Sequence, residues 1–400
     1  MTVSSVPARF GACLALLSIL SVTPALAASA GSAPVVLDGK IPLPTDVPPA
    51  PALSDVSSYI LLDDATGAVI AAKAPHAHLP PASLTKLMTV YLTYQALKAD
   101  TVKMDQVVPV SVAAWKAGGS RMFIQPGMPV TMQQLIAGLM VDSGNDAAVA
   151  LAQAVAGTQA SFVTMMNHTA GLLHLADTHY VNVDGLPADD HYTSAFDLAR
   201  LSRVIIASYP DILKVAAQQY YTYNKIRQPN WNPLVFRDST VDGLKTGLTD
   251  ASGHCIDATA VRSGRRLIAV VMGGPSWKAS ADDIEALLDY GYRFFGNQTV
   301  MKAGDVVGAI DDPLRNPTHV PVSVTETVVM TLPASKTLPL KKTMTVLSGL
   351  KGKIAKGEVV AHVAIGVNGK TIDTVPAVAT IAAKPAGLGQ RLMYEIKRHL

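Results

Sequence analysis

Three short strings of polar and reactive residues occur in order along the chain. Ser83 is followed three residues later by Lys86, Ser143-Gly144-Asn145 comes next, and Lys245-Thr246-Gly247 comes last. A Ser-x-x-Lys pattern is expected about once in a chain of this length. Alone, the second string is most often a plain turn and the third an exposed strand end. All three in this order would arise by chance in about one chain in a thousand. We therefore treat the set as one candidate site.

The spacing of Ser83 and Lys86 fits nucleophilic catalysis. Residues three apart share a helix face, so a base can lie beside the serine hydroxyl. Lysine accepts a proton only when its ammonium form is disfavoured by burial or by a second cation, which Lys245 can supply. The backbone N–H groups of Ser83 and Leu248 are predicted to stabilise the developing oxyanion. This combination predicts acyl transfer.

The other residues fit recognition of a peptide. Ser143 is predicted to relay a proton to a leaving amine, and Asn145 to hold Lys86 and a substrate amide. Lys245 and Thr246, followed by Gly247, are suited to binding a free carboxylate. The predicted substrate is therefore a peptide with an exposed C-terminus.

The elements that must position these residues alternate between strand and helix patterns. An apolar hairpin is predicted at the start, amphipathic or Ala-rich helices in the middle, and three strands with a closing helix at the end. The predicted strands are 59–62, 68–71, 241–248, 254–261 and 265–272, and the predicted helices are 83–98, 132–140, 146–155 and 281–295. This order predicts an α+β domain at 53–297 whose terminal strands meet in one antiparallel sheet.

The C-terminal part has a different composition. Short Val- and Thr-rich runs predict an all-β domain at 298–383, with a hairpin at Asn368-Gly369. In the segment 384–400, apolar residues recur between basic ones, a pattern typical of an amphipathic helix on an anionic membrane surface. A frayed polar tail is the alternative, because Gly387 and Gly389 weaken a helix.

The sequence pattern at the N-terminus predicts export from the cytoplasm. Arg9 precedes an apolar run that ends in small residues, so 1–27 is predicted to be a cleaved signal peptide and 28–52 a proline-rich linker. Cys13 belongs to the predicted signal, which leaves Cys255 as a buried small hydrophobe without a disulfide partner in the mature chain.

Length and composition exclude some classes of protein. The chain has 400 residues and a net charge of +3, with 49% hydrophobic residues. It is too long for one core and lacks the basic surplus of a nucleic-acid-binding protein.

The chain resembles the low-molecular-mass penicillin-binding proteins, which are serine-type D-alanyl-D-alanine carboxypeptidases. Around and beyond the three strings, six segments carry the resemblance: 81–88, 125–128, 143–147, 184–186, 241–247 and 272–274. The resemblance implies a β-lactamase/transpeptidase-like catalytic domain with a helical subdomain, followed by a smaller all-β domain.

The resemblance also implies roles for the residues. Ser83 would be the nucleophile, Lys86 its base, Ser143 and Asn145 the second motif, and Lys245 with Thr246 the carboxylate-binding strand. The substrate would be the peptidoglycan stem peptide ending in D-Ala-D-Ala, and β-lactams would acylate the serine. No cofactor or metal is implied, and the expected location is the periplasm, on the outer face of the inner membrane if the C-terminal helix binds there.

Some positions depart from the family pattern. Leu248 stands where many members have His or an aromatic residue, and Lys278 with Ser280 stand where some have a basic pair, so an expected carboxylate-binding arginine is missing. The segment 113–121, which borders the cleft in the family, is compact.

Several other functions use similar residues. A D,D-endopeptidase acting on crosslinks needs the same groups. A class A β-lactamase needs a glutamate for deacylation, but the first glutamate of the chain is Glu285. A non-catalytic cell-wall-binding protein would be expected to lose Ser83 or Lys86. A zinc site at His76 and His78 is disfavoured because no acidic residue lies at ligand spacing.

Overall fold

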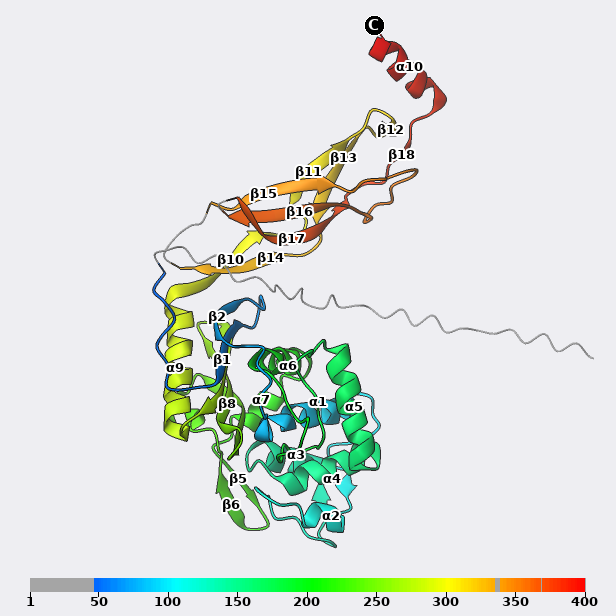
Figure 1. The fold of residues 1–400 in the computed structure, drawn as a ribbon. Coiled ribbons are helices and arrows are strands. Elements are labelled where there is room, and N and C mark those ends of the chain that lie inside the picture. Colours follow the sequence, from blue (N-terminus) through cyan, green and yellow to red (C-terminus); the bar gives the residue numbers. More distant parts are fainter. Residues whose placement is uncertain (1–46, 335–338, 368, 400) are drawn as a thin grey trace, which may run out of the picture. The chain divides into compact units, whose positions relative to one another are not determined.

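The computed structural model describes residues 47–334, 339–367 and 369–399 (Figure 1). The predicted signal peptide and residues 28–46 of the predicted linker lie outside the described residues. The catalytic part of the chain extends to the end of the long helix at Phe294, and the C-terminal part begins with the strand that starts at Phe295.

A five-stranded antiparallel sheet organises the catalytic part, in the order β2-β1-β9-β8-β7. Its strands are β1 (Ser58–Asp63), β2 (Val69–Lys73), β7 (Val241–Thr249), β8 (Gly253–Arg262) and β9 (Arg265–Gly274). Ile60 of β1 pairs with Val270 of β9, which confirms that strands from both ends of the domain meet in one sheet. β7, which carries Lys245, lies at an edge of the sheet.

Helices cover both faces of this sheet (Figure 1). The larger, helical side contains η1 (Ala82–Thr85), α1 (Lys86–Lys98), α2 (Val112–Trp115), α3 (Met132–Met140), α4 (Asn145–Ala156), α5 (Gln159–Leu172), α6 (Ala195–Ser208) and α7 (Ile212–Ala216). On the other side are α8 (Leu234–Arg237) and α9 (Trp277–Phe294). Two small antiparallel strand pairs complete this part: β3 (Val107–Val108) with β4 (Val130–Thr131), which lie on either side of α2 in the chain, and the hairpin of β5 (Tyr220–Tyr223) with β6 (Ile226–Pro229).

The sheet separates two apolar cores. Ile60 and Leu62 of β1 enter the core shared with α1, whereas Leu61 enters the core shared with α9. This alternation follows from the two-residue period of a strand. Cys255 is completely buried in the first core, as predicted.

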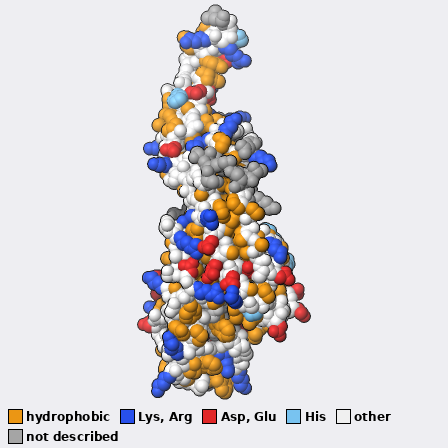
Figure 2. Space-filling view, turned by 90° about the vertical axis from the view of Figure 1, so that its left-hand side faces the viewer, with side chains coloured by type: hydrophobic (Ala, Val, Ile, Leu, Met, Phe, Trp, Pro, Cys, Tyr) orange, Lys and Arg blue, Asp and Glu red, His pale blue; other side chains and the backbone are white. Residues whose placement is uncertain are grey.

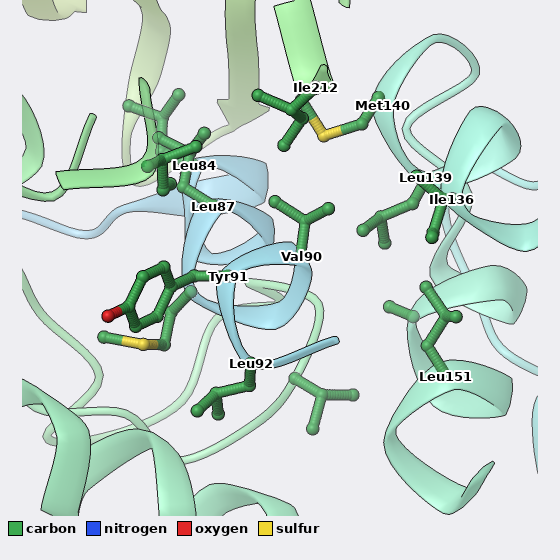
Figure 3. Close-up of a cluster of buried hydrophobic side chains, with 14 of the residues drawn as sticks. Leu84, Leu87, Val90, Tyr91, Leu92, Ile136, Leu139, Met140, Leu151 and Ile212 are labelled. Atoms are coloured by element: carbon green, nitrogen blue, oxygen red, sulfur yellow. The ribbon is translucent and has the colours of Figure 1, made fainter. Parts of the chain in front are cut away.

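α1 is the central helix of the first core. It is apolar around most of its circumference, a pattern typical of a helix buried on all sides. Figure 3 shows Leu87, Val90 and Leu92 pointing to different sides of α1, with Leu139 and Leu151 from neighbouring helices close by. This packing fixes the start of α1, and therefore η1, in the molecule.

Two predicted helices differ from the structure by more than one residue at their start. The segment predicted as one helix from Ser83 divides into the 3-10 turn η1 and the α-helix α1. α9 begins at Trp277, four residues before the predicted start, because the Ser276 side chain accepts a hydrogen bond from the Ala279 backbone N–H and caps the helix.

The C-terminal part is all-β, as predicted. Its main sheet has the order β11-β13-β17-β16-β15, and two pairs of strands flank it. The strands are β10 (Phe295–Met301), β11 (Val306–Asp311), β12 (Arg315–Asn316), β13 (His319–Val324), β14 (Val328–Pro333), β15 (Lys341–Val346), β16 (Val359–Val367), β17 (Lys370–Ala379) and β18 (Lys384–Pro385). Val367 pairs with Lys370, so the predicted hairpin is confirmed.

The last described element is the helix α10 (Leu388–His399). It begins four residues after the start of the predicted tail, because Lys384 and Pro385 pair with β12. Among the described residues, no single helix has the length and apolarity needed to cross a membrane, and only the bent pair α4 and α5 meets those criteria together.

Candidate active site

Ser83 and Lys86 lie side by side at the start of the central helix. The Nζ atom of Lys86 is 2.7 Å from Ser83 Oγ and 2.7 Å from the carbonyl oxygen of Asp184. Ser83 is partly exposed, whereas Lys86 is completely buried. A substrate can therefore reach the hydroxyl while the amine stays away from bulk water.

Burial changes the charge state of this lysine. Desolvation lowers the pKa of Lys86 to about 8, although the carboxylates of Asp184 and Asp146 act in the opposite direction. About one amine in ten is therefore neutral at pH 7. Neutral amine is the form that can take the serine proton.

The second lysine lies in the same polar cluster. Lys245 Nζ donates to Ser143 Oγ at 2.8 Å and to the Thr246 carbonyl at 3.1 Å, and its side chain is buried. Its pKa is also lowered well below the usual value, first by burial and then by repulsion from Lys86. Because the two lysines disfavour each other's charge, they titrate as a pair.

Asn145 has a different set of contacts from the one predicted. It is the first residue of α4, and its side-chain amide donates to the Gly118 carbonyl at 2.6 Å rather than bonding to Lys86. The reason is the close approach of the loop before it: a Cβ atom at Gly119 would lie 2.7 Å from Asn145 Nδ2. Among the described residues, Oδ1 of Asn145 has no hydrogen-bond partner although it is buried.

Two acidic residues flank the Ser143 loop. The buried Asp146 carboxylate accepts hydrogen bonds from the backbone N–H groups of Met122, Phe123 and Ile124, at 2.8 to 3.1 Å. It thereby fixes the loop that passes Asn145. The Asp142 carboxyl is buried with no partner among the described residues, and burial together with the nearby Asp146 raises its pKa to about 8.

The edge strand β7 approaches Ser83 closely. A Cβ atom at Gly247 would lie 3.0 Å from the Pro81 carbonyl and 3.1 Å from the Ser83 nitrogen, so a larger residue would require these neighbours to move by a few tenths of an ångström. Thr246 is nearly buried, while Leu248 is 45% exposed. The two predicted oxyanion donors, the N–H groups of Ser83 and Leu248, therefore come from segments that pack together.

Segment 184–186 carries the resemblance, but sequence reasoning assigned no role to its residues. Asp184 contributes its carbonyl to Lys86, and a Cβ atom at Gly185 would lie 1.8 Å from the Ala82 carbonyl, so this turn supports η1 directly. The Asp-Gly pair is a recognisable turn signal. Its contact with a lysine 98 residues earlier in the chain could not be read from spacing.

The residues that depart from the family pattern have structural contacts. The buried Ser280 hydroxyl donates to the His254 carbonyl at 3.1 Å and so supports the start of β8. Lys278 is exposed and pairs with Asp282 on α9.

His76 and His78 both contact Asp177, at 2.8 and 3.4 Å, an acidic partner that sequence spacing did not indicate.

Comparisons with known sequences agree with this geometry. The sequence model of the D-alanyl-D-alanine carboxypeptidase family of serine peptidases matches residues 47–276, and that of the penicillin-binding protein 5 C-terminal domain matches residues 295–384. The D-alanyl-D-alanine carboxypeptidase DacA of Escherichia coli is 36% identical over 342 residues, which cover 84% of this chain and 85% of that protein.

Solved structures extend the comparison to the fold. Penicillin-binding protein 5 from Haemophilus influenzae superposes with a TM-score of 0.79 at 31% identity, covering 84% of this chain and all of that one. Penicillin-binding protein D2 from Listeria monocytogenes, solved in a cefotaxime-bound form, has a TM-score of 0.57 at 27% identity and covers 61% of this chain and 100% of that chain. The chain therefore belongs to the D-alanyl-D-alanine carboxypeptidase family of serine peptidases, the low-molecular-mass penicillin-binding proteins.

Proposed function

We propose that the chain is a serine D-alanyl-D-alanine carboxypeptidase in which Ser83 is the nucleophile and Lys86 is its base. Ser83 Oγ bonds to the penultimate carbonyl carbon of a stem peptide while Lys86 takes its proton. The C–N bond to the terminal D-alanine then breaks, and the leaving amine gains a proton through Ser143. Water hydrolyses the resulting ester and returns the proton to Ser83. The observation that carries this proposal is the contact of 2.7 Å between a buried lysine amine and a partly exposed serine hydroxyl.

The remaining residues suit recognition of the peptide terminus. The unpartnered Oδ1 of Asn145 would accept a hydrogen bond from the substrate amide. Lys245, when protonated, would attract the terminal carboxylate together with Thr246, and that carboxylate would in turn favour the cationic form of Lys245. β-Lactams carry a similarly placed carboxylate beside a reactive carbonyl, which accounts for covalent acylation of the same serine.

Deacylation of a β-lactam should be slow in this enzyme. The first glutamate of the chain, Glu285, lies on α9, where its carboxylate is 3.9 Å from Arg237. This carboxylate therefore contacts Arg237 on the face of the sheet covered by α9, and Ser83 lies on the opposite face. The β-lactamase alternative thus lacks the base that class A enzymes use for hydrolysis.

Replacing the nucleophile tests the proposal directly. Ser83→Ala should reduce release of D-alanine from a pentapeptide ending in D-Ala-D-Ala by at least about a thousandfold, because the bond-forming oxygen is lost. Covalent labelling by a fluorescent penicillin should disappear as well. Ser161→Ala, at an exposed serine on α5, is the matched control and should keep both activities. Normal labelling of Ser83→Ala would refute the assignment.

We further propose that the enzyme works outside the cytoplasm, at the outer face of the inner membrane. The predicted signal peptide supports export, and a cell-wall substrate requires it. The exposed apolar side chains of α10, which include Leu388, Leu392 and Ile396, support peripheral binding to the membrane surface.

A further inference from the structure

A hollow lined mainly by aromatic and amide side chains lies next to the candidate active site. It has a volume of about 290 Å³ and is formed by the end of the β5–β6 hairpin, the chain between β6 and α8, and the start of α9. Figure 2 shows hydrophobic side chains gathered on the lower part of this face of the molecule, where these elements lie. The mechanism proposed above does not use this hollow.

Three aromatic rings form its walls. Trp231 and Phe236 are 46% and 41% exposed, which is unusual for such large apolar side chains. The rings of Trp231 and Trp277 have centroids 6.3 Å apart, and Trp277 is held edge-on against His254 at 4.9 Å. The rings are thus fixed in place while much of their surface remains open to a ligand.

Hydrogen bonds connect the hollow to the catalytic elements. The Trp231 indole N–H donates to the carbonyl of Asp142, the residue before Ser143, at 3.3 Å. The Gln228 amide donates to the Arg121 carbonyl at 3.0 Å, in the loop that Asp146 fixes. The Asn232 amide donates at 3.4 Å to the carbonyl of Gly243 on β7, two residues before Lys245. A ligand in the hollow would therefore lie along the Ser143 and Lys245 side of the site.

The chemistry of the lining selects a neutral, amphipathic ligand. No charged side chain lines the hollow, which disfavours the carboxylates and ammonium groups of a stem peptide. Within the described residues, Oε1 of Gln228 and the indole N–H of Trp277 are not used in other hydrogen bonds. One acceptor and one donor beside aromatic faces match an acetamido group on a sugar ring.

We propose that this hollow binds an N-acetylated sugar of the peptidoglycan strand to which the stem peptide is attached. The inference rests on the proposed function, because it assigns a second part of the same substrate. The sugar would raise the affinity for glycan-bound stem peptides without contacting the reacting atoms.

Kinetics with two substrates test the proposal. For the unmodified enzyme, kcat/KM should be about three- to tenfold higher for a pentapeptide carrying its N-acetylated disaccharide than for the bare pentapeptide. Trp277→Ala and Phe236→Ala should bring this ratio close to one. Leu172→Ala, at an exposed apolar residue on α5, is the control and should keep the ratio of the unmodified enzyme. A ratio of one in the unmodified enzyme, or an unchanged ratio in both pocket variants, would overturn the proposal.

Direct binding gives an independent readout. Two of the three tryptophans of the chain line the hollow, so a Trp115→Phe variant would place all tryptophan emission there. Titration with a peptide-free tetrasaccharide of N-acetylglucosamine should change this emission saturably, also after penicillin has acylated Ser83. No change would contradict a sugar site, and a response to charged stem peptide alone would assign the hollow to the peptide instead. Failure of either test would leave penicillin labelling of Ser83, which tests the proposed function, unaffected.

Discussion

The charge on Lys86 should set the pH dependence of acylation. Burial lowers the pKa of this amine to about 8, and only the neutral form accepts the Ser83 proton. Below pH 8 the acylation rate constant with penicillin should therefore rise up to about tenfold per pH unit, and it should level off above that pH. Stopped-flow measurement of acylation between pH 5.5 and 9.5 checks this. The inflection belongs to the Lys86 and Lys245 pair, because each amine influences the proton of the other.

Two variants separate this explanation from general effects of pH. Lys86→Arg places a permanent cation at the same position and should abolish acylation at every pH, since guanidinium is not deprotonated in proteins. Lys278→Arg, on the exposed surface of α9, should leave the profile unchanged. A profile that is flat from pH 6 to 9 would exclude Lys86 as the base.

The buried carboxyl group of Asp257 should make the stability of the protein depend on pH. Its carboxyl is completely buried on β8, where one oxygen accepts from Ser202 at 2.6 Å and the other has no partner among the described residues. Burial raises its pKa to about 8. Between about pH 4 and pH 8 the native state therefore holds a proton that the unfolded chain loses, so the stability decreases as the pH rises through this window.

Asp257→Asn should remove this dependence. The amide keeps the shape of the side chain but does not titrate, so the free energy of unfolding should fall less steeply between pH 5 and pH 8, by up to about 1.4 kcal/mol per pH unit. Urea unfolding at several pH values measures the slope. Asp105→Asn, at an exposed aspartate, should leave the slope unchanged. An identical slope in Asp257→Asn would show that this carboxyl is already ionised in the native state.

The sequence predicted contacts within one element better than contacts between elements. The proximity of Ser83 and Lys86 follows from helical spacing alone. The contacts of Lys86 with Asp184 and of Asn145 with Gly118 join positions 98 and 27 residues apart. Spacing carries no information on such pairs, because they depend on how the loops fold over the helices. For this reason the predicted bond from Asn145 to Lys86 was wrong, although both residues lie near the nucleophile.

At the scale of elements, the turn at Gly185 supports the nucleophile. Its φ is +92°, and a Cβ atom there would lie 1.8 Å from the Ala82 carbonyl in η1. Gly185→Ala should displace η1 and reduce penicillin acylation by at least about tenfold, because small shifts of a reacting group are costly. Acylation kinetics and thermal unfolding of the variant measure the two effects.

Gly264 provides a matched control for backbone strain. It has a similar φ of +78° but no atom within 4 Å of an added Cβ. Gly264→Ala should therefore lose about 1 kcal/mol of stability from the left-handed backbone alone and keep normal acylation. If both variants acylated equally well, the contact between the turn and η1 would have no role in positioning Ser83.

Element boundaries show where sequence patterns are weak. The strands β7, β8 and β9 were predicted to within two residues, because turn signals bound their apolar runs. The start of α9 was missed, because Ser276 caps it before the apolar periodicity begins. The apolar period locates the buried face of a helix, whereas polar capping residues determine where the helix begins.

At the scale of the whole molecule, the described residues form three separate apolar cores, two against the catalytic sheet and one in the C-terminal β domain. The helix α10 contributes no buried residue to any of them. Leu388 and Leu392 are 88% and 64% exposed. A helix with its apolar face uncovered and basic residues beside it, such as Lys397, is typical of peripheral membrane binding.

Deleting residues 388–400 should therefore release the enzyme from membranes without changing its chemistry. This deletion keeps β18, which pairs with β12. The deleted form should appear in the soluble fraction and should not bind vesicles containing anionic lipid, while penicillin acylation stays normal.

Two double variants separate the apolar and the electrostatic contributions to membrane binding. Leu392→Ser with Ile396→Ser removes apolar contact, and Lys397→Gln with Arg398→Gln removes charge. The first should abolish binding at all salt concentrations, whereas the second should weaken binding mainly at low salt, where screening is small. Full membrane association of the deleted form would show that α10 is not the anchor.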